Sequence, residues 1–521
     1  MGRTTHKKHT GKRGSQSPGK DSRLKQDKRG TAGASGMSGG SGAPGTSGAS
    51  GASGASGASG ADRMAYVTCT GVRHTPPRLS LIIPPDRLDA ATWDQIESAL
   101  ALPCMVQLAV MPDAHAGYDL CIGGVALLDG HISPSFVGYD IGCGMCHVNT
   151  GLPADEVLPD EAARHLLFDR LRLAIPVGTA TRAHGEYALP RFTSASGDAQ
   201  LTDAVNARQS IQLATLGGGN HFLEVGVNKR GEIGITVHSG SRRSGWDIGA
   251  WYMKQGRLFP LNSRLGRAYR QDMDWALDYA LLNRRLMLEH ALHALADVHR
   301  QQVRPAHKRL ARPANRSEAT GITDLTGCIG DPDATAPQTS ATSTTYYPSG
   351  SPTSPLSSPV PSASPAVLSQ PPLSEQEISL LLNRMINENH NHAVVLAESG
   401  PSGVPLVLHR KGATPAEAGQ PGIIPANQRD GVYVTEGLGN AEYLSSASHG
   451  AGRRMSRNEA QRTIPLARFQ SQMRGIVCRA DKGVLDEAPD AYKPIAEVLA
   501  AQDGVLVRVI DHFRPLVVLK G

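Results

Sequence analysis

Apolar residues follow two different periods along most of the chain, which predicts a mixture of strands and helices. Apolar runs of strand length occupy residues 79–83, 105–111, 122–128, 132–137 and 233–237. Helix-forming stretches occupy residues 92–97, 159–174, 202–216, 266–300 and 373–386. The range 266–300 is long enough for one or two long helices, so a sizeable folded core is expected.

Two of these elements carry specific expectations. The run at 105–111 is expected to end at Pro112, which would place Asp113 and His115 where a loop leaves a sheet. The helix over 159–174 is expected to bury an apolar face made of four leucines, Leu166, Leu167, Leu171 and Leu173.

Two segments are too poor in large apolar residues to pack a core. Residues 31–60 consist almost entirely of small residues and end in Ala-Ser-Gly triplets, and residues 303–373 become rich in Ser, Thr and Pro. We expect a disordered tail over 1–62, a low-complexity surface insertion over 303–373, and one folded domain built from 63–302 and 374–521.

Positive charge is concentrated at the N-terminus. The chain has a formal net charge of +6, but residues 1–30 contain ten Lys or Arg and two Asp. The rest of the chain is therefore close to neutral, which excludes a generally basic nucleic-acid coat and makes any polyanion site in the body local. A solvated tail is the favoured interpretation of residues 1–30, with nuclear import or RNA tethering as the alternative.

The cysteines and the absence of long apolar runs point to an intracellular protein, cytoplasmic or nuclear. Seven cysteines is an odd number, they are scattered, and no secretory signal precedes them. No apolar run reaches the length of a membrane span, so no membrane partner is expected.

The stretch from Ser445 to Arg457 has the composition of a nucleotide-binding site. His449 lies among small residues and glycines, which let the backbone approach a ligand, and three arginines suited to phosphate follow it. The alternative is a Ser/Gly turn ahead of a basic helix, and this stretch by itself does not decide between them.

Four other short stretches combine His, Cys and Asp with small residues, at residues 138–144, 217–222, 237–240 and 389–392. A single histidine after a strand is more often a hydrogen-bonded residue than a ligand. Four such stretches favour a divalent metal site, because thiolate, imidazole and carboxylate are ligands of borderline metals. Neither paired CxxC motifs nor an HExxH motif is present, so the ligands would have to converge through the fold.

Taken together, these blocks resemble the RtcB family of RNA ligases. The matching blocks, in the same order as in the family, are residues 111–115, 138–145, 216–224, 238–242, 390–391, 409–414, 448–453 and 486–489, followed by Tyr492 and Lys493. The resemblance covers the chain from about Met105 to Gly521, apart from the predicted insertion. It implies an α+β fold with packed β-sheets surrounded by helices, and makes the folded domain catalytic.

The resemblance also implies an activity. Enzymes of this family join RNA ends bearing a 3′-phosphate or 2′,3′-cyclic phosphate to 5′-hydroxyl ends, in transfer-RNA splicing or RNA repair, using GTP and manganese. Two Mn²⁺ ions would share Cys143, with His238 and His390 completing one ion and Asp140 and His221 the other. Asp113 and His115 would support the metals.

The catalytic and nucleotide-binding roles follow from the same blocks. His449 would attack GTP to form a histidine-GMP intermediate, and Arg453, together with Arg242, would hold RNA phosphates. The implied GTP contacts are Asn220, His221, Phe222, Leu223, Glu224, Asn391, Asn427, Gly450, Ala451, Gly452, Tyr492 and Lys520.

The chain departs from the family pattern over residues 425–433, where the usual hydroxyls of the guanine pocket become Asn427 and Val432. This puts the nucleotide preference in doubt and leaves two alternatives open. One is a metal-dependent phosphodiesterase or nucleotidyl transferase with altered nucleotide choice, and the other is a non-catalytic RNA-binding scaffold. The expected partners are RNA, as transfer-RNA halves or broken ends, and an archease-like activating protein.

Overall fold

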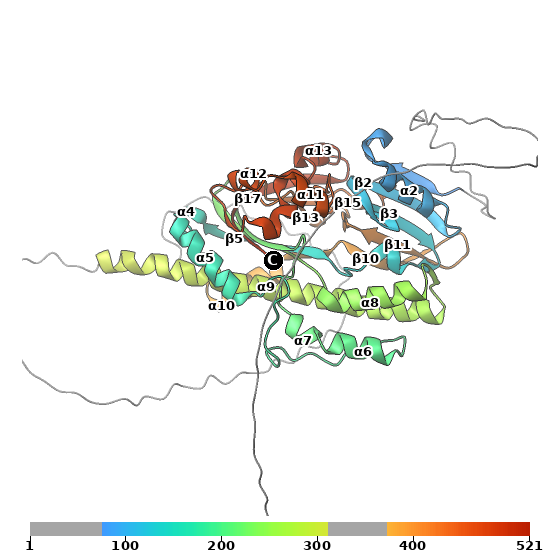
Figure 1. The fold of residues 1–521 in the computed structure, drawn as a ribbon, viewed down its shortest axis with the longest axis horizontal. Helices are drawn as coiled ribbons and strands as arrows, with labels where there is room; N and C mark the ends of the chain where they lie inside the picture. The colour runs from blue at the N-terminus through green and yellow to red at the C-terminus, as the bar shows by residue number, and fades with distance from the viewer. Residues whose placement is uncertain (1–75, 311–371) are drawn as a thin grey trace, which may run out of the picture. The chain divides into compact units, whose positions relative to one another are not determined.

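The computed structural model describes residues 76–310 and 372–521 (Figure 1). The predicted tail over 1–62 and most of the predicted insertion over 303–373 lie outside the described residues. The helix that precedes this gap, α9, continues to Leu310, and Leu373 beyond it is buried in the core.

Two large β-sheets form the framework. The first has five strands in the order β1 (Arg78–Leu81), β2 (Met105–Tyr118), β3 (Leu120–Asp129), β11 (Pro405–Lys411) and β10 (Asn391–Ser399). The second has eight strands, namely β13 (Pro421–Pro425), β14 (Val432–Gly437), β17 (Val507–Lys520), β6 (Phe222–Val227), β7 (Glu232–Ser239), β5 (Gly144–Pro153) and β9 (Ile386–Asn389) in this order, with β16 (Val477–Cys478) also pairing to β17. Two short pairs complete the strands, β12 (Ala413–Pro415) with β15 (Ser446–Ser448), and β4 (His131–Ile132) with β8 (Phe259–Pro260).

Helices cover the sheets on both sides, which confirms the predicted α+β class. On one side lie α9 (Arg264–Leu310), α8 (Arg242–Gln255), α5 (Glu161–Ala174), α6 (Ala199–Asn206) and α10 (Glu375–Arg384) (Figure 1). The other side carries α11 (Arg457–Thr463), α12 (Leu466–Gln472) and α13 (Ile495–Ala500), and α2 (Ala90–Leu100) packs on β2. None of the helices in the described ranges has the length and apolar character that crossing a membrane requires.

The main hydrophobic core forms where α9 packs on the larger sheet. Ile235 of β7 and Leu288 and Leu292 of α9 are fully buried in one cluster, together with Leu167 and Leu171 of α5. This burial explains why the long helical pattern becomes one continuous helix, since its apolar face follows the sheet over several turns. The predicted apolar face of α5 is wrong at Leu173, which is 88% exposed.

Some predicted boundaries differ from the structure for local reasons. β2 does not end at Pro112 but continues to Tyr118, with a shift in its pairing to β3 between Val110 and His115. Asp113 therefore lies inside a strand and is buried. An irregularity of this kind changes the direction in which side chains point, and it is not visible in an apolar pattern.

The predicted strand over 132–137 and the predicted helix over 202–216 are both interrupted. After Ile132 the chain turns into a short helix, α3 (Pro134–Val137), because Ser133 accepts a hydrogen bond from the Phe136 backbone N–H and Pro134 occupies the first turn. α6 ends at Asn206, and a separate turn of helix, α7 (Gln209–Gln212), follows it.

The two sheets meet at a single-residue joint. β9 belongs to the larger sheet and ends at Asn389, while β10 belongs to the smaller sheet and begins at Asn391. His390 alone separates them. Loops from both sheets therefore reach the same place.

A buried arginine, Arg284, forms hydrogen bonds with the segments that meet beside His390. Arg284 of α9 is fully buried and donates hydrogen bonds to the Gly142 and Ser239 carbonyls at 2.8 and 2.9 Å, and to the side-chain oxygens of Asn387 and Asn389 at 2.7 Å each. Burial lowers the pKa of Arg284 to about 10, so it still carries its charge at neutral pH. Its partners belong to the loop before β5, the end of β7, and β9.

We expect Arg284→Met to destabilise the protein by at least about 3 kcal/mol, because four buried acceptors would lose their donor. The matched control is Arg285→Met, since the neighbouring arginine donates one hydrogen bond, to the Leu382 carbonyl at 3.0 Å. Urea unfolding of both variants measures the difference. Equal stabilities of the two variants would contradict the central role of Arg284.

Candidate functional site

Strand register brings four of the predicted blocks together at one end of the larger sheet. β5 pairs with β7 on one side and with β9 on the other, so Gly144 lies opposite both Ser239 and Asn389. β6 pairs with β7 and places Phe222 opposite His238. The residues next to these positions therefore meet, although they are far apart in the sequence.

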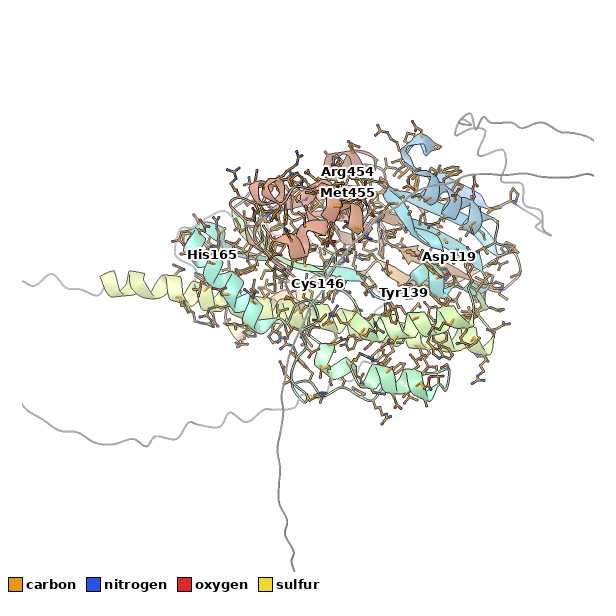
Figure 2. The ribbon with its side chains drawn as sticks, in the orientation of Figure 1. Asp119, Tyr139, Cys146, His165, Arg454 and Met455 are labelled. Carbon is orange, nitrogen blue, oxygen red and sulfur yellow. The ribbon has the colours of Figure 1, made fainter. Side chains whose placement is uncertain are left out.

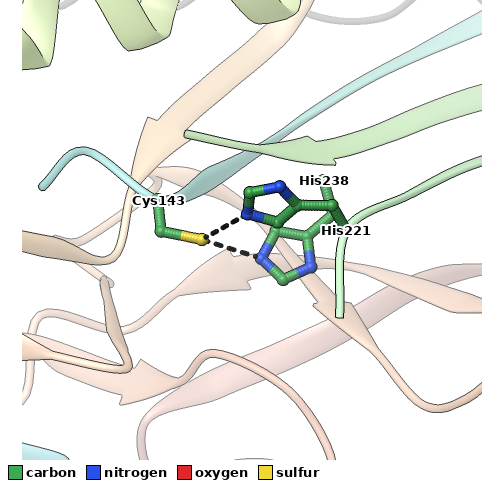
Figure 3. A group of neighbouring side chains, drawn as sticks. All are labelled: Cys143, His221 and His238. Atoms are coloured by element: carbon green, nitrogen blue, oxygen red, sulfur yellow. Dashed lines mark hydrogen bonds between the residues drawn. The ribbon is translucent and has the colours of Figure 1, made fainter. Parts of the chain in front are cut away.

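The result is a buried cluster of one thiol and two imidazoles (Figure 3). Cys143 Sγ lies 3.2 Å from His238 Nε2 and 3.5 Å from His221 Nε2. These three ligand atoms all lie within 4.8 Å of one another. His221 Nε2 is also 3.0 Å from Asp140 Oδ2, and the His390 backbone N–H donates to the Cys143 carbonyl at 2.8 Å.

Four imidazole rings form a row that leads away from this cluster. The ring centroids are 5.3 Å apart between His221 and His238, 5.1 Å between His238 and His390, and 4.9 Å between His390 and His449. His449 follows β15, which is paired through β12 to the joint at His390. All five predicted metal-ligating residues and the predicted nucleophile are therefore adjacent.

A buried carboxylate, that of Asp113, lies against the Nδ1 atom of His449. This Nδ1 lies 2.7 Å from Oδ2 of Asp113, which is 0% exposed. The orientation of the two groups is not that of a hydrogen bond, and neither oxygen of Asp113 has a hydrogen-bond partner among the described residues. Sequence reasoning expected Asp113 to support the metals, whereas the structure places it against His449.

Glycines allow this close approach. A Cβ atom on Gly452 would lie 2.2 Å from the Asp113 carbonyl oxygen, and one on Gly412 would lie 3.0 Å from the His449 ring. Both residues also have a positive φ, at +71° and +61°. Side chains at these positions would force Asp113 and His449 apart.

The protonation states suit metal binding. Burial, followed by the neighbouring imidazoles, lowers the pKa of His238 and of His390 well below the usual range, so both are neutral at pH 7 and can offer a lone pair. Burial and the adjacent Asp140 raise the pKa of the Cys143 thiol well above its usual value. A divalent cation would reverse this by stabilising the thiolate. The thiolate and imidazoles therefore fit a borderline divalent metal such as zinc, and the Asp140 carboxylate beside them is a ligand of the kind that manganese prefers.

A cavity of about 570 Å³ lies on the His449 side of the imidazole row. Its lining includes most of the predicted nucleotide contacts and both predicted catalytic residues, namely Asn220, Phe222, Glu224, Asn427, His449, Gly450, Ala451, Gly452, Arg453, Tyr492 and Lys520.

Three of the predicted nucleotide contacts, His221, Leu223 and Asn391, do not line this cavity, and neither does Val432. Leu223 is buried in the main core, and Val432 is buried beside Phe513. Asn391 uses its side chain locally, donating to the Asp140 carbonyl at 3.1 Å and accepting from the Gly412 N–H at 2.8 Å. It therefore ties the loop of the metal-binding cluster to the glycine beside His449.

Glu487 organises the wall of the cavity, a role that sequence reasoning did not assign. Its carboxylate pairs with Lys520 at 3.1 Å and Arg453 at 3.0 Å, contacts Arg457, and accepts a hydrogen bond from the Tyr492 hydroxyl. Burial by itself would raise the pKa of Glu487, but the cations, first Lys520 and then Arg457, lower it to about 2. Three cations are thus fixed at one wall by one carboxylate.

The hydrogen bonds of Arg453 indicate a structural role that the sequence did not predict. The remaining N–H groups of Arg453 donate to the backbone carbonyls of Asp486 at 2.7 Å and Met455 at 3.1 Å. The guanidinium therefore shapes the loop after His449, and the neighbouring Arg454 and Arg457 also line the cavity. The acidic pair Asp486 and Glu487, within the block at 486–489, was the only sequence signal for Glu487, because its partners come from three other segments.

Comparison with known proteins identifies the family to which the chain is similar. The chain matches the family described as tRNA-splicing ligase RtcB over residues 95–199, 191–312 and 367–521. It is 30% identical to the RNA-splicing ligase RtcB of Escherichia coli K12 over 469 residues, which cover 83% of this chain and 95% of that protein. It is 27% identical to the tRNA-splicing ligase RtcB of Aeropyrum pernix over 497 residues, covering 79% of this chain and 87% of that protein.

We expect Mn²⁺ to raise the melting temperature of the wild type in a concentration-dependent manner, because a ligand that binds only the folded state stabilises it. Cys143→Ser should abolish most of this shift. Cys146→Ser is the matched control, since Cys146 is buried in the adjacent strand but its Sγ contacts the Arg284 carbonyl, not the cluster. Thermal denaturation, with the bound metal measured by elemental analysis, checks both. An equal metal shift in all three proteins would contradict the assigned cluster.

We expect Glu487→Gln to cost about 3 kcal/mol at pH 7, because it leaves buried cations without their anion. The lowered pKa means that this stabilisation is complete above the ordinary value of 4.5 and is lost as the pH falls towards 2. The difference in melting temperature between wild type and variant should therefore shrink below about pH 4.5. The exposed Glu497→Gln is the control and should change stability by less than about 1 kcal/mol.

Proposed function

Because the chain belongs to the RtcB family of RNA ligases, we propose that it joins RNA ends carrying a 3′-phosphate or 2′,3′-cyclic phosphate to 5′-hydroxyl ends, using GTP and manganese, in transfer-RNA splicing or RNA repair. The observation that carries the proposal is the position of His449. Its ring contacts a buried carboxylate on one side, the Cys143 cluster through His390 on another, and the large cavity on a third. A histidine in this position can act as a nucleophile towards a nucleotide bound in the cavity.

The metal would be held by this chain's own thiol and imidazoles. Cys143, His221 and His238 offer the most compact donor set, and His390 and Asp140 lie next to it on either side. When bound, a divalent ion supplies positive charge that stabilises phosphate groups during displacement at phosphorus.

Asp113 determines which nitrogen of His449 reacts. The carboxylate lies against Nδ1, so Nε2 remains available for the α-phosphate of GTP. Attack by Nε2 forms the N–P bond and releases pyrophosphate, while the positive charge that develops on the imidazole is balanced by the Asp113 carboxylate. The product is a histidine-GMP phosphoramidate.

The activated nucleotide then passes to the RNA. An oxygen of the RNA 3′-phosphate attacks the phosphorus of GMP and releases His449, which gives the RNA end the leaving group that it lacked. The 5′-hydroxyl of the second RNA attacks the activated 3′-phosphate and expels GMP, leaving a phosphodiester. An end with a cyclic phosphate is first opened by water to a 3′-phosphate.

The cavity wall supports the binding of a triphosphate. Lys520, Arg453 and Arg457 pair with two carboxylates, Glu487 and Asp486, so this part of the wall still has one more cation than anions. The guanidinium of Arg454, which also lines the cavity, donates to the backbone carbonyl of Asp490 and to no carboxylate among the described residues. Phosphate groups would complete this charge balance.

The choice of nucleotide base is a separate question, because the side chain of Asn427 forms its hydrogen bonds with residues of its own loop. Its side-chain amide donates to Asp430 Oδ2 at 2.7 Å, and its oxygen accepts from the backbone N–H groups of Arg429 and Asp430. This observation favours the second candidate, a nucleotidyl transferase or phosphodiesterase with altered nucleotide choice. The two candidates differ in which nucleotide labels His449.

We expect incubation with α-labelled GTP and Mn²⁺ to label the protein covalently, and His449→Ala to abolish the label. A phosphoramidate is stable to alkali and labile to acid, which identifies the bond after denaturing electrophoresis. Asp113→Asn should retain the nucleophile but lose charge balance at Nδ1, so its labelling rate should fall by about 100-fold or more.

The same assay with ATP, CTP and UTP separates the candidates. Labelling by GTP alone supports the ligase, and preferential labelling by another nucleotide supports the alternative. Labelling that survives His449→Ala, or no label with any nucleotide even after an archease-like protein is added, would contradict the proposed mechanism. Ligation of a 3′-phosphate RNA to a 5′-hydroxyl RNA then tests the complete reaction.

A further inference from the structure

All the exposed aromatic side chains of the described residues lie in one row on the surface. Tyr118 is 56% exposed, Tyr139 36% and Trp246 40%. The ring centroids of Tyr118 and Tyr139 are 5.8 Å apart, and those of Tyr139 and Trp246 are 5.6 Å apart with nearly parallel planes, at 20°. Only 4% of the chain is aromatic, so three exposed rings in contact are not a consequence of composition.

Three elements build this row, and α8 positions them. Tyr118 ends β2, Trp246 lies on α8, and Tyr139 lies in the loop between α3 and β5, beside α8 (Figure 2). A Cβ atom on Gly249 would lie 3.0 Å from the Gly138 carbonyl oxygen and 3.5 Å from Tyr139 Cα. The glycine therefore lets the loop sit directly on the helix, which brings Tyr139 over Trp246.

Cationic side chains flank the rings. The guanidinium of Arg243 lies over the Trp246 ring, 3.8 Å from its centroid, and Lys411 Nζ is 5.9 Å from the Tyr118 centroid. Arg243 also pairs with Asp247 at 3.0 Å, which holds its plane in place. The row thus combines flat π surfaces with a flat, charged guanidinium.

The row leads to the metal-binding cluster from outside the nucleotide cavity. Tyr139 directly precedes Asp140, whose Oδ2 is 3.0 Å from His221 Nε2, at the opposite end of the imidazole row from His449. None of Tyr118, Tyr139 or Trp246 lines the cavity. A strand bound along the row would have its end at the cluster without displacing the nucleotide.

We infer that this aromatic row, Tyr118, Tyr139 and Trp246 with Arg243, binds single-stranded RNA next to the ends that are joined. The inference rests on the proposed function for the identity of the ligand. Bases stack on exposed aromatic rings and on guanidinium planes whatever their sequence. Arg243 is the exposed cation of the row, since Lys411 is buried and donates to the Tyr118 and Ser135 carbonyls. A protein partner would also cover exposed rings, but it would not explain a guanidinium fixed flat against the stack beside a site for phosphate chemistry.

The test is equilibrium binding of a fluorescent RNA about 10 nucleotides long, measured by anisotropy without GTP. Trp246→Leu and Tyr118→Leu should each weaken binding by roughly 5- to 100-fold, the range for loss of one stacked base. Trp246→Phe and Tyr118→Phe keep a ring and should restore most of the affinity. The control is Tyr433→Leu, because Tyr433 stacks on His512 in the larger sheet, away from this row.

An RNA with abasic sites at its ligating end separates stacking from charge. Wild type should bind this RNA more weakly than the intact RNA, and Trp246→Leu should show little further loss. Unchanged RNA affinity in the leucine variants overturns the inference, as does an equal loss for intact and abasic RNA. Loss of a protein complex with intact RNA affinity would assign the row to that partner instead.

These outcomes are independent of the nucleotide chemistry. If wild type binds RNA through the row but His449 is never labelled, the proposed ligase mechanism fails and the RNA-binding row stands. If His449 is labelled but the ring variants bind RNA normally, only the inference fails. Melting temperatures of all variants exclude unfolding as the cause of any loss.

Discussion

The structure of the site depends on one buried guanidinium. Arg284 has no carboxylate partner among its hydrogen bonds and is satisfied by two backbone carbonyls and two asparagine oxygens. A buried charge of this kind is tolerated only if its acceptors keep their positions. Those acceptors are immediate neighbours of Cys143, His238 and His390, so the helix that builds the main core also fixes the geometry of the chemical centre.

Two electrostatic environments lie on either side of His449. The cluster side is buried, burial keeps the imidazoles of His238 and His390 neutral by lowering their pKa values, and the Cys143 thiol has a raised pKa. The cavity side carries several cations arranged around one carboxylate, Glu487. The cluster offers donor atoms of the kind that hold a metal ion, and the cavity wall offers cationic groups. His449 lies between the two, with its Nδ1 2.7 Å from Asp113.

The separation between the cluster side and the cavity side of His449 extends to the surface of the protein. The cavity is lined by the loop after His449, whereas the aromatic row reaches the cluster through Tyr139 and Asp140. The irregular pairing within β2 contributes to both, since that strand carries Asp113 in its buried part and Tyr118 at its exposed end. One strand therefore connects the surroundings of His449 with the exposed aromatic row.

The sequence by itself determined the α+β class, four of the strands (β1, β2, β3 and β7), the helices α2, α5, α9 and α10, and the residues that converge as a possible metal cluster, because hydrophobic periods are local and the blocks resemble a known family. It did not determine that β2 continues past Pro112, that Asp113 contacts His449, or that Arg284 and Glu487 organise the site. Those features depend on strand register and on partners distant in the chain. A lone Arg in a helix, or a Glu in a turn, carries no local pattern that reveals which buried groups it will meet.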